Sequence, residues 1–167
     1  LHEVGHTLGL NHNFKGSYLH NNQDVHNPEI TGKVGVTASV MEYPAINLAP
    51  LGVEQGDYYD TIPGPYDIWA IKYGYTPNLS EDELAAIIAE EIKAEHMFAN
   101  DSEDMRSPGR GIDPRAMIND LTNDPITYAI NRIELLNHTQ DNIVPRLADR
   151  VETCLLYTSD AADEDLR

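Results

Sequence analysis

The chain has 167 residues, 41% of them hydrophobic, and its 28 acidic residues against 11 basic ones give a formal net charge of -17. Such a charge repels phosphate backbones and argues against nucleic-acid binding, and the chain has no run of about eighteen apolar residues that would span a membrane. The function classes that remain are an enzyme and a binding module, either of them built on one packed domain.

The first nine residues, 1–9, are predicted to form the last part of a helix that carries metal-binding histidines. His2 and His6 stand one helical turn apart, so both imidazoles point from the same face toward one metal ion. Glu3 lies beside His2 and can reach a water on that metal without becoming a ligand itself.

A glycine predicts where this helix ends. Gly9 lacks a Cβ atom and takes the left-handed conformation readily, so the chain can turn back and His12 can supply a third nitrogen. Three neutral imidazoles and a water form the open tetrahedral site of catalytic zinc. The spacing H-E-x-x-H-x-x-G-x-x-H therefore favours one catalytic Zn²⁺ bound by His2, His6 and His12; histidines in a core, or a decayed site, are the alternatives.

Residues 13–62 are rich in glycine, asparagine and proline and show little periodicity, which predicts loops that frame a cleft. His20 and His26 fall in this stretch. We expect them to be surface or loop histidines, because three metal ligands are already assigned. Glu42 is expected to be an exposed loop carboxylate.

A short helix is predicted to begin at Pro65, a residue favoured in the first turn, and Gly74 is expected to end it. Trp69 and the tyrosines around it are predicted to be packing residues that hold this helix behind the histidines. They are not expected to form a binding platform.

Two more helices are predicted further along the chain. Ser80-Glu-Asp-Glu83 is a capping box, and Asp124-Pro125 combines an N-cap residue with a first-turn proline. Pro145 is expected to kink or stop the second of these helices. The apolar stripes that these helices are expected to bury comprise Leu84, Ile87, Ile88 and Ile92, and Ile126, Ile130, Ile133 and Leu136.

A segment downstream of the histidines completes a family pattern. With the zinc motif, Ser39-Val40-Met41-Glu42-Tyr43 resembles the metzincin metalloproteases and their Met-turn. The resemblance implies that Met41 lies beneath the histidines as an apolar floor, although an ordinary core methionine is the alternative. It also implies that Tyr43 approaches the metal and then hydrogen-bonds the oxyanion of the tetrahedral intermediate. Further segments are similar to a bacterial group of large, exported zinc metalloproteases with a Met-zincin domain: His12–Gly16, Met41–Pro44 and Gly64–Tyr75.

The resemblance also implies a fold and covers roughly residues 1–150. Zincin domains are α+β and place a twisted sheet before the zinc helix, so this chain is expected to be mainly α with long irregular loops, the N-terminal sheet being absent. Residues 1–153 are expected to form a partial catalytic domain with a C-terminal helical portion. Residues 154–167, which include the single cysteine Cys154, resemble a translated sequencing adapter; a genuine acidic tail is the alternative.

The activity that the resemblance implies is that of a zinc-dependent endopeptidase acting on protein or peptide substrates. Glu3 is expected to act as general base, taking a proton from the zinc-activated water and passing it to the leaving amine. Without a sheet edge to align a substrate, the 167 residues alone are expected to have little activity. The rival hypothesis is a non-catalytic zinc-binding structural or interaction module. The family points to a periplasmic or extracellular location, and the sequence indicates no oligomeric state.

Overall fold

The structure is a computed structural model that describes residues 1–103 and 113–148. It divides into two units, residues 1–132 and residues 133–167. The metal-binding motif and all the loops discussed below belong to the first unit. The predicted boundary between residues 153 and 154 lies outside the described residues.

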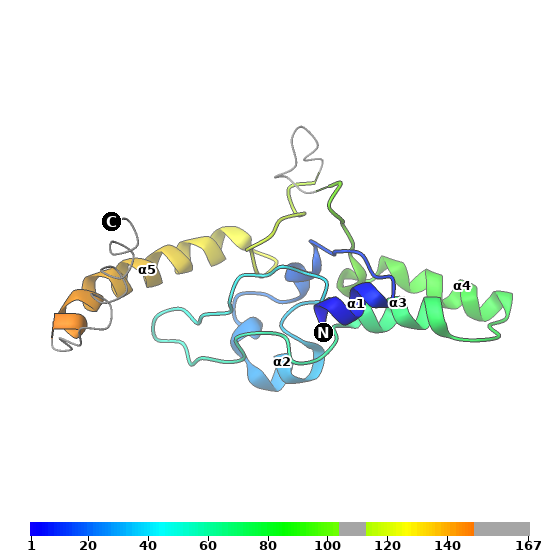
Figure 1. Cartoon of the computed structure of the whole chain (residues 1–167), viewed down its shortest axis with the longest axis horizontal. Helices are drawn as coiled ribbons and strands as arrows, with labels where there is room; N and C mark the ends of the chain where they lie inside the picture. Colours follow the sequence, from blue (N-terminus) through cyan, green and yellow to red (C-terminus); the bar gives the residue numbers. More distant parts are fainter. Residues whose placement is uncertain (104–112, 149–167) are drawn as a thin grey trace, which may run out of the picture. The chain divides into compact units, whose positions relative to one another are not determined.

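Helices and irregular loops make up the described part of the chain, which contains no β-strand (Figure 1). The prediction of a mainly α chain with long loops is therefore confirmed. Short 3₁₀ helices join the α-helices at Gly16–Leu19, Asp24–His26, Glu90–Ile92 and Ala94–His96. The α-helices are α1 (His2–Thr7), α2 (Pro28–Val34), α3 (Pro65–Tyr75), α4 (Glu81–Ala89) and α5 (Pro125–Ala148).

Helix α1 ends two residues earlier than predicted but for the predicted reason. Gly9 has a φ of 85°, in the left-handed region, and its N–H donates to the carbonyl of His6 at 3.0 Å. The Leu10 N–H donates to the carbonyl of Gly5, also at 3.0 Å, which completes a Schellman cap. This cap turns the chain back toward the histidine-bearing face of α1.

Helix α2 lies in the stretch for which only loops were predicted. The side chain of Asn27 caps it by accepting from the Glu29 N–H at 3.0 Å, and Pro28 occupies the first turn. These are ordinary start signals, but the seven residues are too few to produce a visible hydrophobic period. The prediction for this segment was wrong on that point.

Helices α3 and α4 lie side by side (Figure 1). Trp69 joins them by donating its indole N–H to the carbonyl of Ile87 at 2.8 Å, and its ring stacks on His96, which agrees with its predicted packing role. The predicted capping box is present at Ser80. Helix α3 continues past Gly74, contrary to prediction, because the stop signal is Thr76, an extended residue that precedes a proline.

The apolar stripe predicted for α4 is only partly buried. Ile87 is 4% exposed, whereas Ile92 is 92% exposed. The α-helix ends at Ala89 and the following turn is 3₁₀, so residues beyond it no longer follow the 3.6-residue period.

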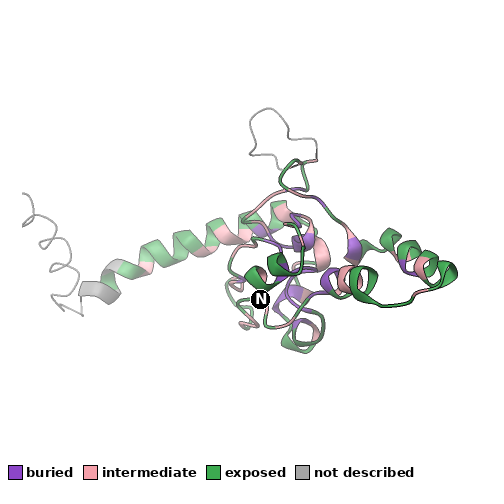
Figure 2. Cartoon of the chain, turned by 45° about the vertical axis from the view of Figure 1, so that its right-hand side comes forward, coloured by how far each residue is buried: buried purple, intermediate pink, exposed green. Residues whose placement is uncertain are grey.

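Two small clusters of buried side chains form the apolar core of the first unit (Figure 2). Each cluster draws on segments that are far apart in sequence. One contains Phe14, Ala99 and Ala116 and the other Val25, Val36, Leu121 and Tyr128. The first cluster begins two residues after His12 and fixes the backbone that follows the metal-binding motif.

Helix α5 differs from its prediction in two respects. Its start at Pro125 is as predicted, but the helix continues through Pro145 to Ala148, so this proline interrupts the hydrogen-bond ladder without ending the helix. The stripe expected to be buried is exposed, with Ile126 at 74% and Leu136 at 62%. Tyr128 is the buried contact of the N-terminal part. In the described residues no helix has both the length and the apolar character that crossing a membrane requires.

Candidate metal centre

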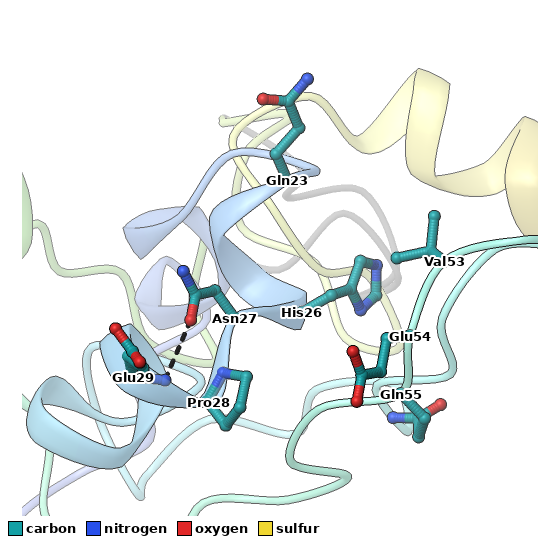
Figure 3. A pocket seen from close by; sticks show the side chains of 8 residues that line it. All are labelled: Gln23, His26, Asn27, Pro28, Glu29, Val53, Glu54 and Gln55. Carbon is teal, nitrogen blue, oxygen red and sulfur yellow. Dashed lines mark hydrogen bonds between the residues drawn. The ribbon is translucent and has the colours of Figure 1, made fainter.

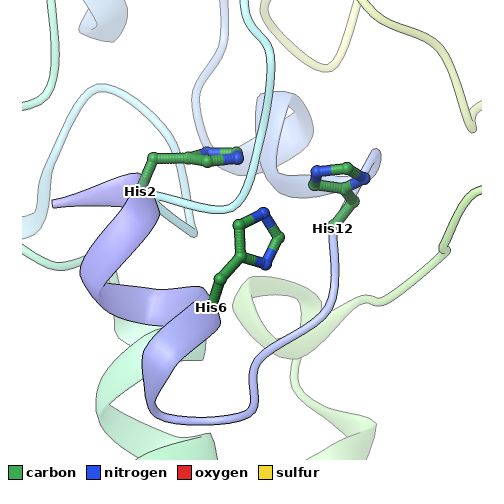
Figure 4. A group of neighbouring side chains, drawn as sticks. All are labelled: His2, His6 and His12. Carbon is green, nitrogen blue, oxygen red and sulfur yellow. The ribbon is translucent and has the colours of Figure 1, made fainter.

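Three histidine side chains gather beside α1 (Figure 4). His2 and His6 project from the same face of the helix, and His12 reaches back from the loop after the Gly9 turn. One ring nitrogen of each lies within 4.8 Å of the corresponding nitrogens of the other two. The structure thus brings together the three residues that the sequence predicted as metal ligands.

The backbone selects the ring nitrogen that each histidine of α1 presents. Nδ1 of His2 lies 2.7 Å from the carbonyl of Val40, and Nδ1 of His6 lies 3.0 Å from the carbonyl of Leu10. A carbonyl oxygen only accepts hydrogen bonds, so Nδ1 must carry the proton in both rings. In the neutral tautomer with the proton on Nδ1, Nε2 has a free lone pair, which is the form of histidine that binds a metal.

Nδ1 of His12 is held by a side chain. Both carboxylate oxygens of Asp101 lie 3.0 Å from it. Sequence reasoning missed Asp101, because it lies 89 positions after His12 in a polar loop that carries no recognisable motif.

The donor set fits a zinc ion. The Nε2 atoms of His2 and His12 are buried and form no hydrogen bond within the described part of the chain. A buried polar atom without a partner is costly, and it is rarely left so in a folded protein. Three neutral imidazole nitrogens are a ligand set that suits zinc, with the fourth position open to water.

Met41 lies directly beneath α1. Its side chain is fully buried, and a Cβ atom added to Gly5 would collide with the Met41 sulfur. The second variable position of the motif, Gly5, is therefore a glycine because the helix rests on this thioether. The Asn13 N–H donates to the Met41 carbonyl at 3.0 Å and ties the chain after His12 to the same residue.

We expect Gly5→Ala to destabilise the chain by about 1–3 kcal/mol, because the added methyl overpacks against Met41. The matched control is Gly74→Ala, since a Cβ at Gly74 meets nothing within 4 Å and the helix should gain up to about 1 kcal/mol. Denaturant unfolding of both variants measures the two effects. Equal stability of the two variants would show that Met41 does not support α1 in this way.

A buried aspartate fastens the segment that contains Met41. Asp67 of α3 accepts from the Ser39 hydroxyl at 2.6 Å, from the Val40 N–H at 2.8 Å and from the Gly64 N–H at 2.9 Å. One carboxylate thus caps α3 and holds the turn beneath the histidines. The capping position, two residues after Pro65, was the only sequence signal that could have indicated it.

Tyr43 lies against the histidine cluster. Its ring centre is 4.7 Å from that of His2 and 4.9 Å from that of His12, and the side chain is 44% exposed. The ring therefore contacts the histidine cluster and remains partly exposed to solvent. Glu3, in the first turn of α1, is also exposed to solvent.

Glu42 is buried, which contradicts its prediction as an exposed carboxylate. Its oxygens accept from the Tyr43 N–H at 2.9 Å and from the Ser17 N–H at 3.1 Å. Burial raises the pKa of Glu42 to about 8, and the charge of the nearby Asp120 carboxylate adds to this rise. Burial also raises the pKa of Asp120 to about 6, so the two groups do not both ionise readily near neutral pH.

His20 and His26 lie outside the metal cluster, but both are buried rather than at the surface. His20 pairs with the carbonyl of Gly35 at 2.8 Å, and burial lowers the pKa of His26. His26 lines a cavity of about 490 Å³ between residues 23–29 and 53–55 (Figure 3). None of the three clustered histidines lines this cavity.

A sequence profile of the Met-zincin family matches residues 1–155. No curated protein and no solved structure matches the chain. The family match spans the histidine motif, the Met41 turn and the whole of the described structure.

Proposed function

The chain belongs to the Met-zincin family, and from this premise we propose that the protein carrying it is a zinc-dependent endopeptidase. Membership of the family indicates a metallopeptidase that binds zinc and acts on peptides. The hydrolysis of internal peptide bonds and the role of each residue are the proposal. The observation that carries it is the convergence of three histidine nitrogens within 4.8 Å, each ring held through its other nitrogen.

The residues that would hold one zinc ion are His2, His6 and His12. When bound, zinc lowers the pKa of a water toward neutrality and polarises a carbonyl group. The partners of the three Nδ1 atoms place a proton on that nitrogen in each ring, so Nε2 is the nitrogen available to the metal. The chain also leaves one side of the cluster open to solvent, as the exposure of His6 indicates.

Glu3 is the proposed general base. It follows His2 directly on α1 and lies beside the histidine-bearing face, where its exposed carboxylate is free to accept a proton from a nucleophilic water. The same carboxyl group then delivers that proton to the nitrogen of the leaving amine. One residue thus serves as base in the first half of the reaction and as acid in the second.

Tyr43 is the proposed oxyanion donor. Its hydroxyl would donate a hydrogen bond to the oxygen that gains negative charge as the carbonyl carbon becomes tetrahedral. The short ring distances to His2 and His12 support this role, as does the exposure of the phenol.

We also propose that the described helices are the C-terminal part of an α+β zincin domain, with residues 1–153 belonging to it. In such a domain, the edge of a sheet binds an extended peptide by main-chain hydrogen bonds. The family match and the placement of His2 and His6 on a helix over Met41 support this assignment.

A peptide-cleavage assay on the complete protein that carries this chain tests the proposal. Cleavage is expected to stop when a chelator removes zinc and to return when zinc is restored. Cleavage that continues at full rate without zinc would contradict the mechanism. A protein that binds zinc but cleaves no peptide would favour the rival function, a zinc-binding structural or interaction module.

A further inference from the structure

The three histidines of the metal centre differ in what holds their second ring nitrogen. His2 and His6 bond to backbone carbonyls, which the turns around α1 fix in place. His12 bonds instead to the carboxylate of Asp101, with both oxygens at 3.0 Å from Nδ1. Among the described residues, Asp101 is the side chain that hydrogen-bonds a ring of the cluster.

We propose that Asp101 is a positioning residue for the metal centre, which fixes the tautomer and the orientation of the His12 ring. A carboxylate that accepts the Nδ1–H bond of a metal-binding histidine stabilises the required tautomer and strengthens the bond from the other nitrogen to the metal. A neutral backbone carbonyl also stabilises the tautomer, but it strengthens the bond to the metal less. The inference rests on the proposed function, since it requires that the three histidines bind zinc.

The fold brings Asp101 to His12 because the residues just after His12 form hydrogen bonds with the residues just before Asp101. The Asn13 side-chain amide donates to the carbonyl of Met97 at 3.0 Å, and its oxygen accepts from the Ala99 N–H at 3.2 Å. The Phe14 N–H donates to the carbonyl of Ala99 at 2.8 Å. Two segments that are far apart in sequence are therefore joined immediately beside the His12–Asp101 contact.

A local turn then directs the carboxylate. The side chain of Asn100 accepts from the Ser102 N–H at 2.9 Å, and the Asn100 N–H donates to the carboxylate of Glu103 at 2.9 Å. These bonds fix the backbone on both sides of Asp101. The position of its carboxylate is thus set by buried contacts on one side and by a closed turn on the other.

The contact is too exposed to contribute much to folding. The Asp101 side chain is 68% exposed and that of His12 is 21% exposed. Exposed pairs of this kind contribute little to stability, because water screens the charges. An effect of Asp101 on zinc affinity can therefore be separated from an effect on the fold.

The test is the dissociation constant for zinc, measured by competition with a chromophoric chelator on the full chain. Asp101→Ala is expected to weaken zinc binding by about 10–100-fold. The zinc affinity of Asp101→Asn is expected to lie between those of Asp101→Ala and the unaltered chain. Its amide oxygen accepts the Nδ1–H bond but carries no charge. Asp141→Ala, which removes an exposed acid from α5, is the charge-matched control and should leave the affinity unchanged.

Thermal unfolding of the zinc-free proteins completes the experiment, and we expect the unaltered chain and Asp101→Ala to unfold at nearly the same temperature. If Asp101→Ala binds zinc as tightly as the unaltered chain, the inference is wrong while the proposed metal centre stands. If the unaltered chain binds no zinc, both are wrong. A loss of affinity equal to that in Asp141→Ala would assign the effect to net charge and would also overturn the inference.

Discussion

Replacing Glu3 by glutamine is expected to reduce peptide cleavage by the complete protein by about 10²–10⁴-fold, the usual contribution of a general base. Glutamine has nearly the same size and shape, but its amide cannot accept the proton of the nucleophilic water. Because Glu3 is exposed and supplies no metal-binding atom to the cluster, zinc binding and stability should not change. The rate of cleavage of a peptide substrate and the zinc content of the same sample measure both parts.

The control for this experiment is Glu134→Gln on α5, which makes the same chemical change at an exposed position remote in sequence from the motif. It should cleave at the rate of the unaltered protein. A Glu3→Gln protein that retains both zinc and full activity would remove Glu3 from the mechanism. A variant that loses zinc as well as activity would instead make Glu3 part of the metal site.

The arrangement of the three histidines was largely predictable because its determinants are local. The pitch of one helix is enough to place His2 and His6 on the same face. The turn at Gly9 depends only on the ability of glycine to adopt a positive φ, which is 85° in the structure. The start of α5 and the capping box of α4 are likewise fixed by two to four adjacent residues. Such signals remain legible without knowledge of the tertiary fold.

The supporting residues were not predictable, because their roles depend on contacts between distant segments. Asp67 reaches Ser39 across 28 positions and Asp101 reaches His12 across 89. Glu42 was predicted to be exposed because it is charged and lies in a loop, yet it satisfies two backbone N–H groups in the interior. Burial of a carboxylate depends on such partners, and sequence spacing does not reveal them.

The exposed stripe of α5 shows the opposite error. Its apolar residues recur at helical spacing, which ordinarily indicates a buried face. In the structure Ile126, Ile133 and Leu136 are all more than half exposed. Periodicity indicates that a helix has an apolar side, but it does not identify what covers that side.

His6→Ala is expected to abolish stable zinc binding. Zinc held by three protein ligands loses one of its strongest bonds, and the remaining pair, His2 and His12, must bind it from two different segments. The decrease in affinity should exceed the effect of about 10–100-fold that is typical for residues that support a ligand. The matched control is His138→Ala, because His138 is exposed on α5 and lies outside the cluster.

The zinc content per chain after dialysis tests the three-histidine centre most directly. We predict about one zinc per chain for the unaltered protein and for His138→Ala, and nearly none for His6→Ala. Absence of zinc from the unaltered chain, or equal zinc in the two histidine variants, would contradict the assignment of His2, His6 and His12 as its ligands.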